Sequence, residues 1–169
     1  RRMIQWAASQ AKGIITVSQA LKDSLVQLGV KPAAITPLRN GVNLDTFRPL
    51  DREAIRATLG LSQYTLISVG HLIELKGHHL VIGALPSLPD VVLLIAGHGP
   101  DRGKLEALAQ KLGVADRVRF LGAVPQPELK QYFNAADLMV LASSREGWAN
   151  VLLESMACGT PVVASAVGG

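Results

Sequence analysis

The sequence has few of the residue types that mark several functional classes. Its 169 residues include a single cysteine, Cys158, which excludes an internal disulfide and favours a reducing compartment. It contains no Asp-x-Asp pair and no His/Cys group with ligand spacing, so no metal site is predicted. No apolar run approaches the roughly 20 residues of a membrane span, and no secretory signal is visible. We therefore expect a cytoplasmic protein.

The residues that are abundant indicate a buried α/β core. Apolar residues make up 49% of the chain and aromatic residues only 4%, as expected for parallel strands covered on both faces. The formal charge of +4 suits an anionic ligand, but the basic residues are too scattered to predict nucleic-acid binding. Arg1, Arg2, Trp6 and Lys12 would suit a helix in peripheral contact with a membrane, although an ordinary surface helix is the simpler interpretation.

Apolar strands alternate steadily with helical segments over most of the chain. Strands are predicted at residues 65–69, 91–96, 118–121, 137–141 and 161–164, with helices between them. This order is typical of a Rossmann-like, doubly wound parallel sheet. Ligands of such sheets bind outside the carboxyl ends of the strands. On this prediction four residues lie at that edge: His71, Gly97, Gly122 and Ser143.

The first part of the chain is predicted to differ from the rest. It contains a helix near residues 1–12, a strand at 13–17, a helix ending at Leu28 and a poor strand at 35–38 that includes Pro37. Turn residues interrupt the pattern at 40–50, so we expect one unit at 1–42 and a second at 43–169. The chain begins at Arg1 rather than Met and stops just past a predicted strand, and we expect it to be part of a longer protein.

A loop that runs into a helix near residue 149 is the strongest candidate for chemistry. Unpaired amides at a helix start, with the helix dipole, can hold a phosphate group. Glu146 and Glu154 bracket this loop, and carboxylates can accept hydrogen bonds from sugar hydroxyls. A sugar nucleotide would satisfy both features. Glu154 is expected near the first turn, where an acid is favourable even without a ligand.

Residues 143–161 resemble the nucleotide-sugar site of retaining glycosyltransferases of family 4, which have the GT-B fold of two facing Rossmann-like domains. Four further stretches are similar to motifs of this family in the same order: 40–49, 69–77, 96–100 and 117–122. The resemblance implies transfer of a sugar from a donor such as a UDP- or GDP-sugar, with no metal or other cofactor. It also implies that this chain is the donor-binding half, that residues 1–42 are a remnant of the acceptor-side domain, and that the chain is inactive alone.

The resemblance also implies roles for individual residues. Lys76 and His71 match the positions that bind the diphosphate in the family. The family has Arg where this chain has His71, and imidazole is only partly charged near neutral pH. Glu154 matches the glutamate that binds the ribose hydroxyls. Glu146 matches the residue that faces the transferred sugar and is not a nucleophile. From the residues alone, Lys76 could equally be a solvated lysine and His71 a capping histidine.

The remaining candidates would bind the donor through the backbone or shape its pocket. Trp148 is predicted either to line the sugar pocket or to pack in the core. Asn150 is predicted either to cap the helix or to bind the sugar. The glycine-rich turns are expected to provide backbone contacts or simply tight connections. The complete set of these donor-binding candidates is Gly70, Gly97, Gly99, Gly147, Trp148, Ala149, Asn150, Val151 and Leu152.

Three other functions remain as alternatives. A non-catalytic nucleotide- or phosphate-binding Rossmann module would bind bare nucleotide as well as the sugar nucleotide. An NAD-dependent oxidoreductase is disfavoured because Gly97, Gly99 and Gly103 miss the G-x-G-x-x-G spacing. A glycosidase is disfavoured because its two carboxylates would come from one contiguous segment. The base, the sugar, the acceptor (glycan, lipid or small molecule) and the oligomeric state are not determined by the sequence.

Overall fold

The computed structural model describes residues 2–167, which fall into two compact units. Residues 2–41, 145–150 and Val167 form the smaller unit. Val42–Ser144 and Val151–Ala166 form the larger unit. The first change of unit lies beside the expected boundary at 42/43, but the sequence did not indicate that residues 145–150 group with the smaller unit.

The smaller unit contains a parallel two-stranded sheet with a helix in the connection. Its elements are α1 (Arg2–Gln10), β1 (Ile14–Thr16), α2 (Gln19–Gln27), the short 3₁₀ helix η1 (Pro32–Ala34) and β2 (Ile35–Pro37). Ser18 begins α2 as predicted, because its side chain accepts a hydrogen bond from the Leu21 amide. Pro37 is tolerated since a two-stranded sheet has only edge strands.

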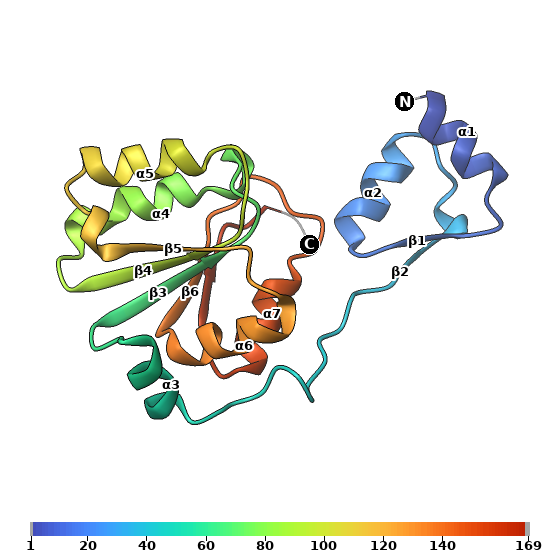
Figure 1. Ribbon diagram of the computed structural model, residues 1–169. Helices are drawn as coiled ribbons and strands as arrows, with labels where there is room; N and C mark the ends of the chain where they lie inside the picture. The colour runs from blue at the N-terminus through green and yellow to red at the C-terminus, as the bar shows by residue number, and fades with distance from the viewer. Residues whose placement is uncertain (1, 168–169) are drawn as a thin grey trace. The chain divides into compact units, whose positions relative to one another are not determined.

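The larger unit is built on a five-stranded sheet in which every neighbouring pair is parallel. The strands stand in the order β5-β4-β3-β6-β7, and Figure 1 shows β3 and β4 at the centre of the molecule's larger part. Their bounds are β3 (Tyr64–Val69), β4 (Val91–Ala96), β5 (Val118–Gly122), β6 (Leu138–Leu141) and β7 (Val162–Ala164). This arrangement confirms the predicted Rossmann-like α/β fold.

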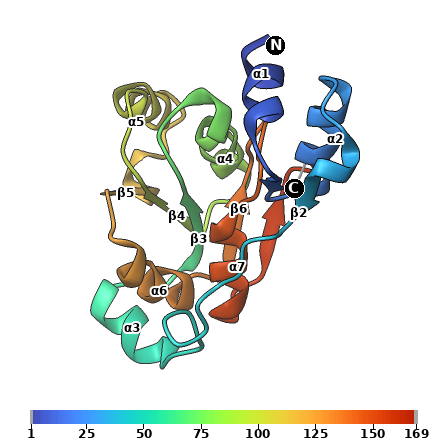
Figure 2. The ribbon, with the colours of Figure 1, turned by 90° about the vertical axis from the view of Figure 1, so that its right-hand side faces the viewer.

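Helices cover both faces of this sheet (Figure 2). One face carries α4 (His78–Ala84) and α5 (Arg102–Lys111), and the other carries α3 (Arg52–Leu59), α6 (Gln126–Ala135) and α7 (Asn150–Ala157). Three 3₁₀ helices complete the connections: η2 (Glu74–Lys76), η3 (Leu85–Ser87) and η4 (Ala115–Arg117). No helix within residues 2–167 is both long enough and apolar enough to span a bilayer.

The two faces form two separate cores because side chains alternate along each strand. On β4, Leu94 belongs to the core under α3, α6 and α7, together with Ile67 and Phe133. Its neighbours Leu93 and Ile95 belong to the core under α4 and α5. Every one of these five side chains is almost completely buried, so the central strands read in the sequence as continuous apolar runs.

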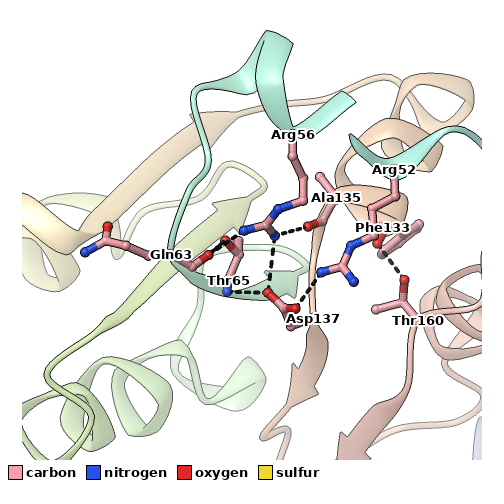
Figure 3. Close-up of polar contacts among 8 residues, drawn as sticks. All are labelled: Arg52, Arg56, Gln63, Thr65, Phe133, Ala135, Asp137 and Thr160. Carbon is pink, nitrogen blue, oxygen red and sulfur yellow. Dashed lines mark hydrogen bonds and ion pairs between the residues drawn. The ribbon is translucent and has the colours of Figure 1, made fainter. Parts of the chain in front are cut away.

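An ionic cluster around Asp137 ties α3 to the amino ends of β3 and β6 (Figure 3). The carboxylate accepts hydrogen bonds from Arg52 (2.5 Å), Arg56 (3.2 Å) and the Thr65 amide (2.7 Å). Burial opposes ionisation of Asp137, but the Thr65 amide and the charges of Arg52 and Arg56 together lower its pKa below the ordinary value. The cluster lies at the edge of the sheet opposite the carboxyl ends of the strands, so its role is to hold the fold together.

Candidate functional site

The order of the strands predicts where a ligand would bind at the carboxyl ends of the sheet. From β3 the chain adds β4 and β5 on one side, and it then crosses to add β6 and β7 on the other. Ligands of open α/β sheets bind where the order reverses in this way. The reversal lies between β3 and β6, and the loops that leave these strands are residues 70–77 and 142–149.

Glycines let the loops at this edge pack backbone against backbone. A Cβ atom on Gly97 would lie 1.8 Å from the Gly70 carbonyl oxygen, and one on Gly77 would lie 2.0 Å from that of Ala142. Gly77 also has a φ of 68°, which side chains disfavour. Only glycine fits at either position, so the loops after β3, β4 and β6 are held together closely.

The same packing occupies two amides that we expected to face a ligand. The Gly70 amide donates to the Ala96 carbonyl (3.0 Å), and the Gly97 amide donates to the Gly122 carbonyl (2.7 Å). A Cβ atom on Gly99 would lie 2.4 Å from a carbonyl oxygen. In this structure Gly97 and Gly99 therefore act as close-packing residues. Direct contact with a donor stays a prediction for all three glycines.

Three basic side chains lie on the loops after β3 and β4. His71 is exposed, and its ring meets that of His98 edge-on with centroids 5.1 Å apart. Lys76 is half-buried at the end of η2, and its Cδ atom lies 3.5 Å from the position of a Cβ on Gly70. This group could meet the negative charge of a phosphate. The sequence indicated His71 and Lys76, but no chemistry was predicted for His98.

A buried histidine lies behind the loop after β3. His78 begins α4 and is 1% exposed, and its Nδ1 atom is 2.9 Å from the Ser68 hydroxyl. Burial lowers the pKa of His78, although the nearby carbonyls of His71 and Gly70 partly offset this effect. Burial therefore favours the neutral form of His78, which packs behind the loop.

The carboxylate of Glu154 is buried, and only one of its two oxygens has a hydrogen-bond donor. Glu154 is 4% exposed, and its Oε1 atom accepts a hydrogen bond from the Gln126 amide at 2.6 Å. Its Oε2 atom is buried and has no hydrogen-bond partner among the described residues. A buried carboxylate oxygen without a donor is costly, so this oxygen is a good candidate acceptor for a ligand.

Glu154 lies just past the first turn of its helix, close to the expected position. It is the fifth residue of α7, whose first turn contains no acid. The favourable effect of the helix dipole is confined to the first turn, so it does not explain this glutamate. Val151 and Leu152, in the first turn, pack against the core, and only their backbone is left for the predicted donor contacts.

The other predicted residues lie in the smaller unit. Glu146 and Ala149 are partly buried. A Cβ on Gly147 would lie 3.4 Å from the nearest side-chain atom, so the protein itself does not require glycine there. Because Glu146 and Glu154 belong to different units, their joint action on one ligand stays a prediction.

Two contacts join the loop at 145–150 to the segment before Gly41. The Arg39 guanidinium lies over the Trp148 ring, 5.4 Å from its centroid, and the Trp148 Nε1 atom is buried without a partner among the described residues. The Asn150 side chain accepts a hydrogen bond from the Asn40 amide at 3.3 Å. Asn150 is the first residue of α7, so its side chain links two segments in place of the predicted cap.

Within residues 2–167 no group of three or more His, Cys, Asp or Glu side chains is arranged to hold a metal ion. The basic side chains on the loops after β3 and β4 are those of His71, Lys76 and His98. Together these features define a Rossmann-like α/β protein whose candidate site lies at the switch point of its sheet.

The chain belongs to the glycosyl transferases group 1, because the model of that family matches residues 51–169. This is the family-4, GT-B class that the motifs resemble. A D-inositol 3-phosphate glycosyltransferase of Mycobacterium sp. (strain KMS) is 39% identical over 173 residues, which cover 98% of this chain. That alignment spans 39% of the relative's length, so this chain corresponds to only part of such a protein.

Solved structures agree with this assignment. The structure of Anabaena Alr3699/HepE in complex with UDP and glucose has a TM-score of 0.92 and 28% identity, over all of this chain and 48% of that one. Sucrose-phosphate synthase from Thermosynechococcus elongatus has a TM-score of 0.85 and 31% identity, over 98% of this chain and 44% of the synthase.

Proposed function

We propose that this chain is the donor-binding half of a glycosyltransferase that moves a sugar from a nucleotide sugar to an acceptor with retention of anomeric configuration. Family membership supports the reaction class. The similarity to a protein solved with UDP and glucose supports a nucleotide-sugar donor. We expect the complete protein to be cytoplasmic, with peripheral contact to a membrane.

The observation that carries this proposal is the unpartnered Oε2 atom of Glu154. Glu154 contacts Gln126, which begins α6 shortly after β5, so the carboxylate belongs to the carboxyl-end side of the sheet. A carboxylate here can accept hydrogen bonds from the ribose hydroxyls of the donor. This interaction would satisfy an oxygen that otherwise remains buried without a donor.

The proposed reaction breaks the bond between the anomeric carbon and the phosphate oxygen of the donor. A new bond forms from the same face between that carbon and the acceptor oxygen, and the acceptor's proton passes to the departing phosphate. Negative charge grows on the diphosphate during this step, and fixed cations and amides stabilise it. We assign this role to Lys76, His71 and the amides at 149–152, and we assign the sugar hydroxyls to Glu146.

The test is calorimetric titration of the chain with UDP-, GDP- and ADP-glucose. Glu154→Gln should weaken binding of the preferred donor about 10- to 150-fold, the range for hydrogen bonds to a charged group. Glu128→Gln is the matched control, because Glu128 is an exposed acid on α6 of the same unit. Wild-type binding by Glu154→Gln, or no binding of any donor by the unaltered chain, would refute the assignment.

A nucleotide-binding module without transferase function remains a testable alternative. It would bind UDP as tightly as UDP-glucose, and Glu146→Ala would leave the affinity unchanged. The proposal instead requires that the attached sugar strengthens binding and that Glu146→Ala removes that gain. We also expect no turnover by this chain alone, and sugar transfer by it to any of a panel of acceptors would contradict the assignment to the donor half.

A further inference from the structure

The hydrogen bond between Gln126 and Glu154 joins an exposed amide to a buried carboxylate. Gln126 is the first residue of α6, and Glu154 lies in α7, 28 positions further along the chain. The Nε2···Oε1 distance of 2.6 Å is short for an amide donor. Among the described residues, Gln126 is the one hydrogen-bond partner of this carboxylate.

This single contact determines how the carboxylate is presented. Without a donor on either oxygen, a Glu side chain rotates freely about its last torsion. The Gln126 amide engages Oε1 and leaves Oε2 without a partner. The two oxygens are therefore not equivalent, and Oε2 is the one without a donor.

A purely structural bond between α6 and α7 would look different. An ordinary tie between two helices leaves neither partner with a buried, unsatisfied atom, because such an atom costs stability. Glu154 retains one despite the contact with Gln126. The contact with Gln126 thus leaves one acceptor of this carboxylate available for a further donor.

We propose that Gln126 is a positioning residue for the donor: it holds Glu154 through Oε1 so that Oε2 accepts the hydrogen bond of a ribose hydroxyl. This inference rests on the proposed function. It assigns to the amino end of α6 a part in recognising ribose, although Gln126 itself need not touch the donor.

The experiment compares a nucleoside diphosphate with its 2′-deoxy and 3′-deoxy analogues by calorimetry, using whichever of UDP, GDP and ADP the unaltered chain binds best. Gln126→Ala should weaken binding of the ribonucleotide about 5- to 15-fold. It should change binding of the deoxy analogue that lacks the recognised hydroxyl by less than about twofold. Gln131→Ala is the matched control, because Gln131 is exposed on the same helix.

A double-mutant cycle gives an independent measure. If Gln126 acts through Glu154, Gln126→Ala combined with Glu154→Ala should bind no more weakly than Glu154→Ala alone. Additive losses, or equal losses for the ribonucleotide and both deoxy analogues, would overturn the positioning role. If Gln126→Ala does not fold, Gln126→Met provides the same comparison, since it keeps roughly the length of the side chain and removes the donor without adding a charge.

Failure of this inference can be told apart from failure of the proposed function. If Glu154→Gln loses affinity while Gln126→Ala retains it, only the role of Gln126 is wrong. If the unaltered chain does not discriminate against either deoxy analogue, the assignment of Glu154 to ribose is wrong as well.

Discussion

Replacing Asp137 should destabilise the larger unit strongly. Asp137→Ala removes the acceptor for the buried Thr65 amide and the partner of Arg56, whose side chain is 14% exposed. Arg56 keeps hydrogen bonds to the Ala135 and Gln63 carbonyls, which limits the loss. The pair with Arg52 adds little, because that side chain is 45% exposed and exposed pairs contribute about 1 kcal/mol or less.

From these contacts we expect Asp137→Ala to lower the free energy of unfolding by about 2 to 4 kcal/mol: about 1 to 3 kcal/mol for leaving the buried Thr65 amide without an acceptor, and about 1 kcal/mol for the partly buried pair with Arg56. Asp137→Asn keeps an acceptor for the Thr65 amide and should cost about 1 to 2 kcal/mol. Arg52→Ala should cost less than about 1 kcal/mol. Urea unfolding followed by far-UV circular dichroism at pH 7 measures all three.

The same cluster predicts an acid dependence of stability. The folded-state pKa of Asp137 is lowered, so its contribution is present above the unfolded pKa of about 3.9 and is lost as the pH falls through the folded value. Asp137→Asn should therefore lose less stability than the unaltered chain between pH 5 and about pH 3. Superimposable acid dependences, or a cost below about 1 kcal/mol for Asp137→Ala, would refute this reasoning.

Two further substitutions probe the edge of the sheet that carries the candidate site. Gly97→Ala should lower the free energy of unfolding in urea by about 3 kcal/mol, because its Cβ would overlap the Gly70 carbonyl. As a control, Gly103→Ala should be neutral or stabilising by up to about 1 kcal/mol, because a Cβ there meets nothing within 4 Å. Equal effects of the two substitutions would contradict the close packing. His71→Arg should strengthen binding of a nucleoside diphosphate about fivefold at pH 8, because Arg is fully charged and bidentate; unchanged calorimetric affinity would show that His71 does not contact phosphate.

The local pattern of the sequence was sufficient to predict the fold. Apolar runs such as 91–96 read as buried parallel strands, and the structure has β4 at Val91–Ala96. Asp51 and Gly60, at the two ends of α3, provide a helix cap and a left-handed terminus, both of which are local features of the sequence. These features depend on neighbouring residues, because strand periodicity, capping and turn geometry are local properties of the chain.

The candidate site depended much more on tertiary structure. The resemblance to a family identified Glu154, but neither its position beyond the first turn of α7 nor its unpartnered Oε2 atom follows from spacing. Gln126 and His98 carried no local signal, since each acquires its partner only when segments distant in the sequence pack together. The sequence by itself thus determined the elements and the family. Strand order, buried polar contacts and the exclusion of side chains at Gly97 were decided by the packing of distant segments, which no local pattern encodes.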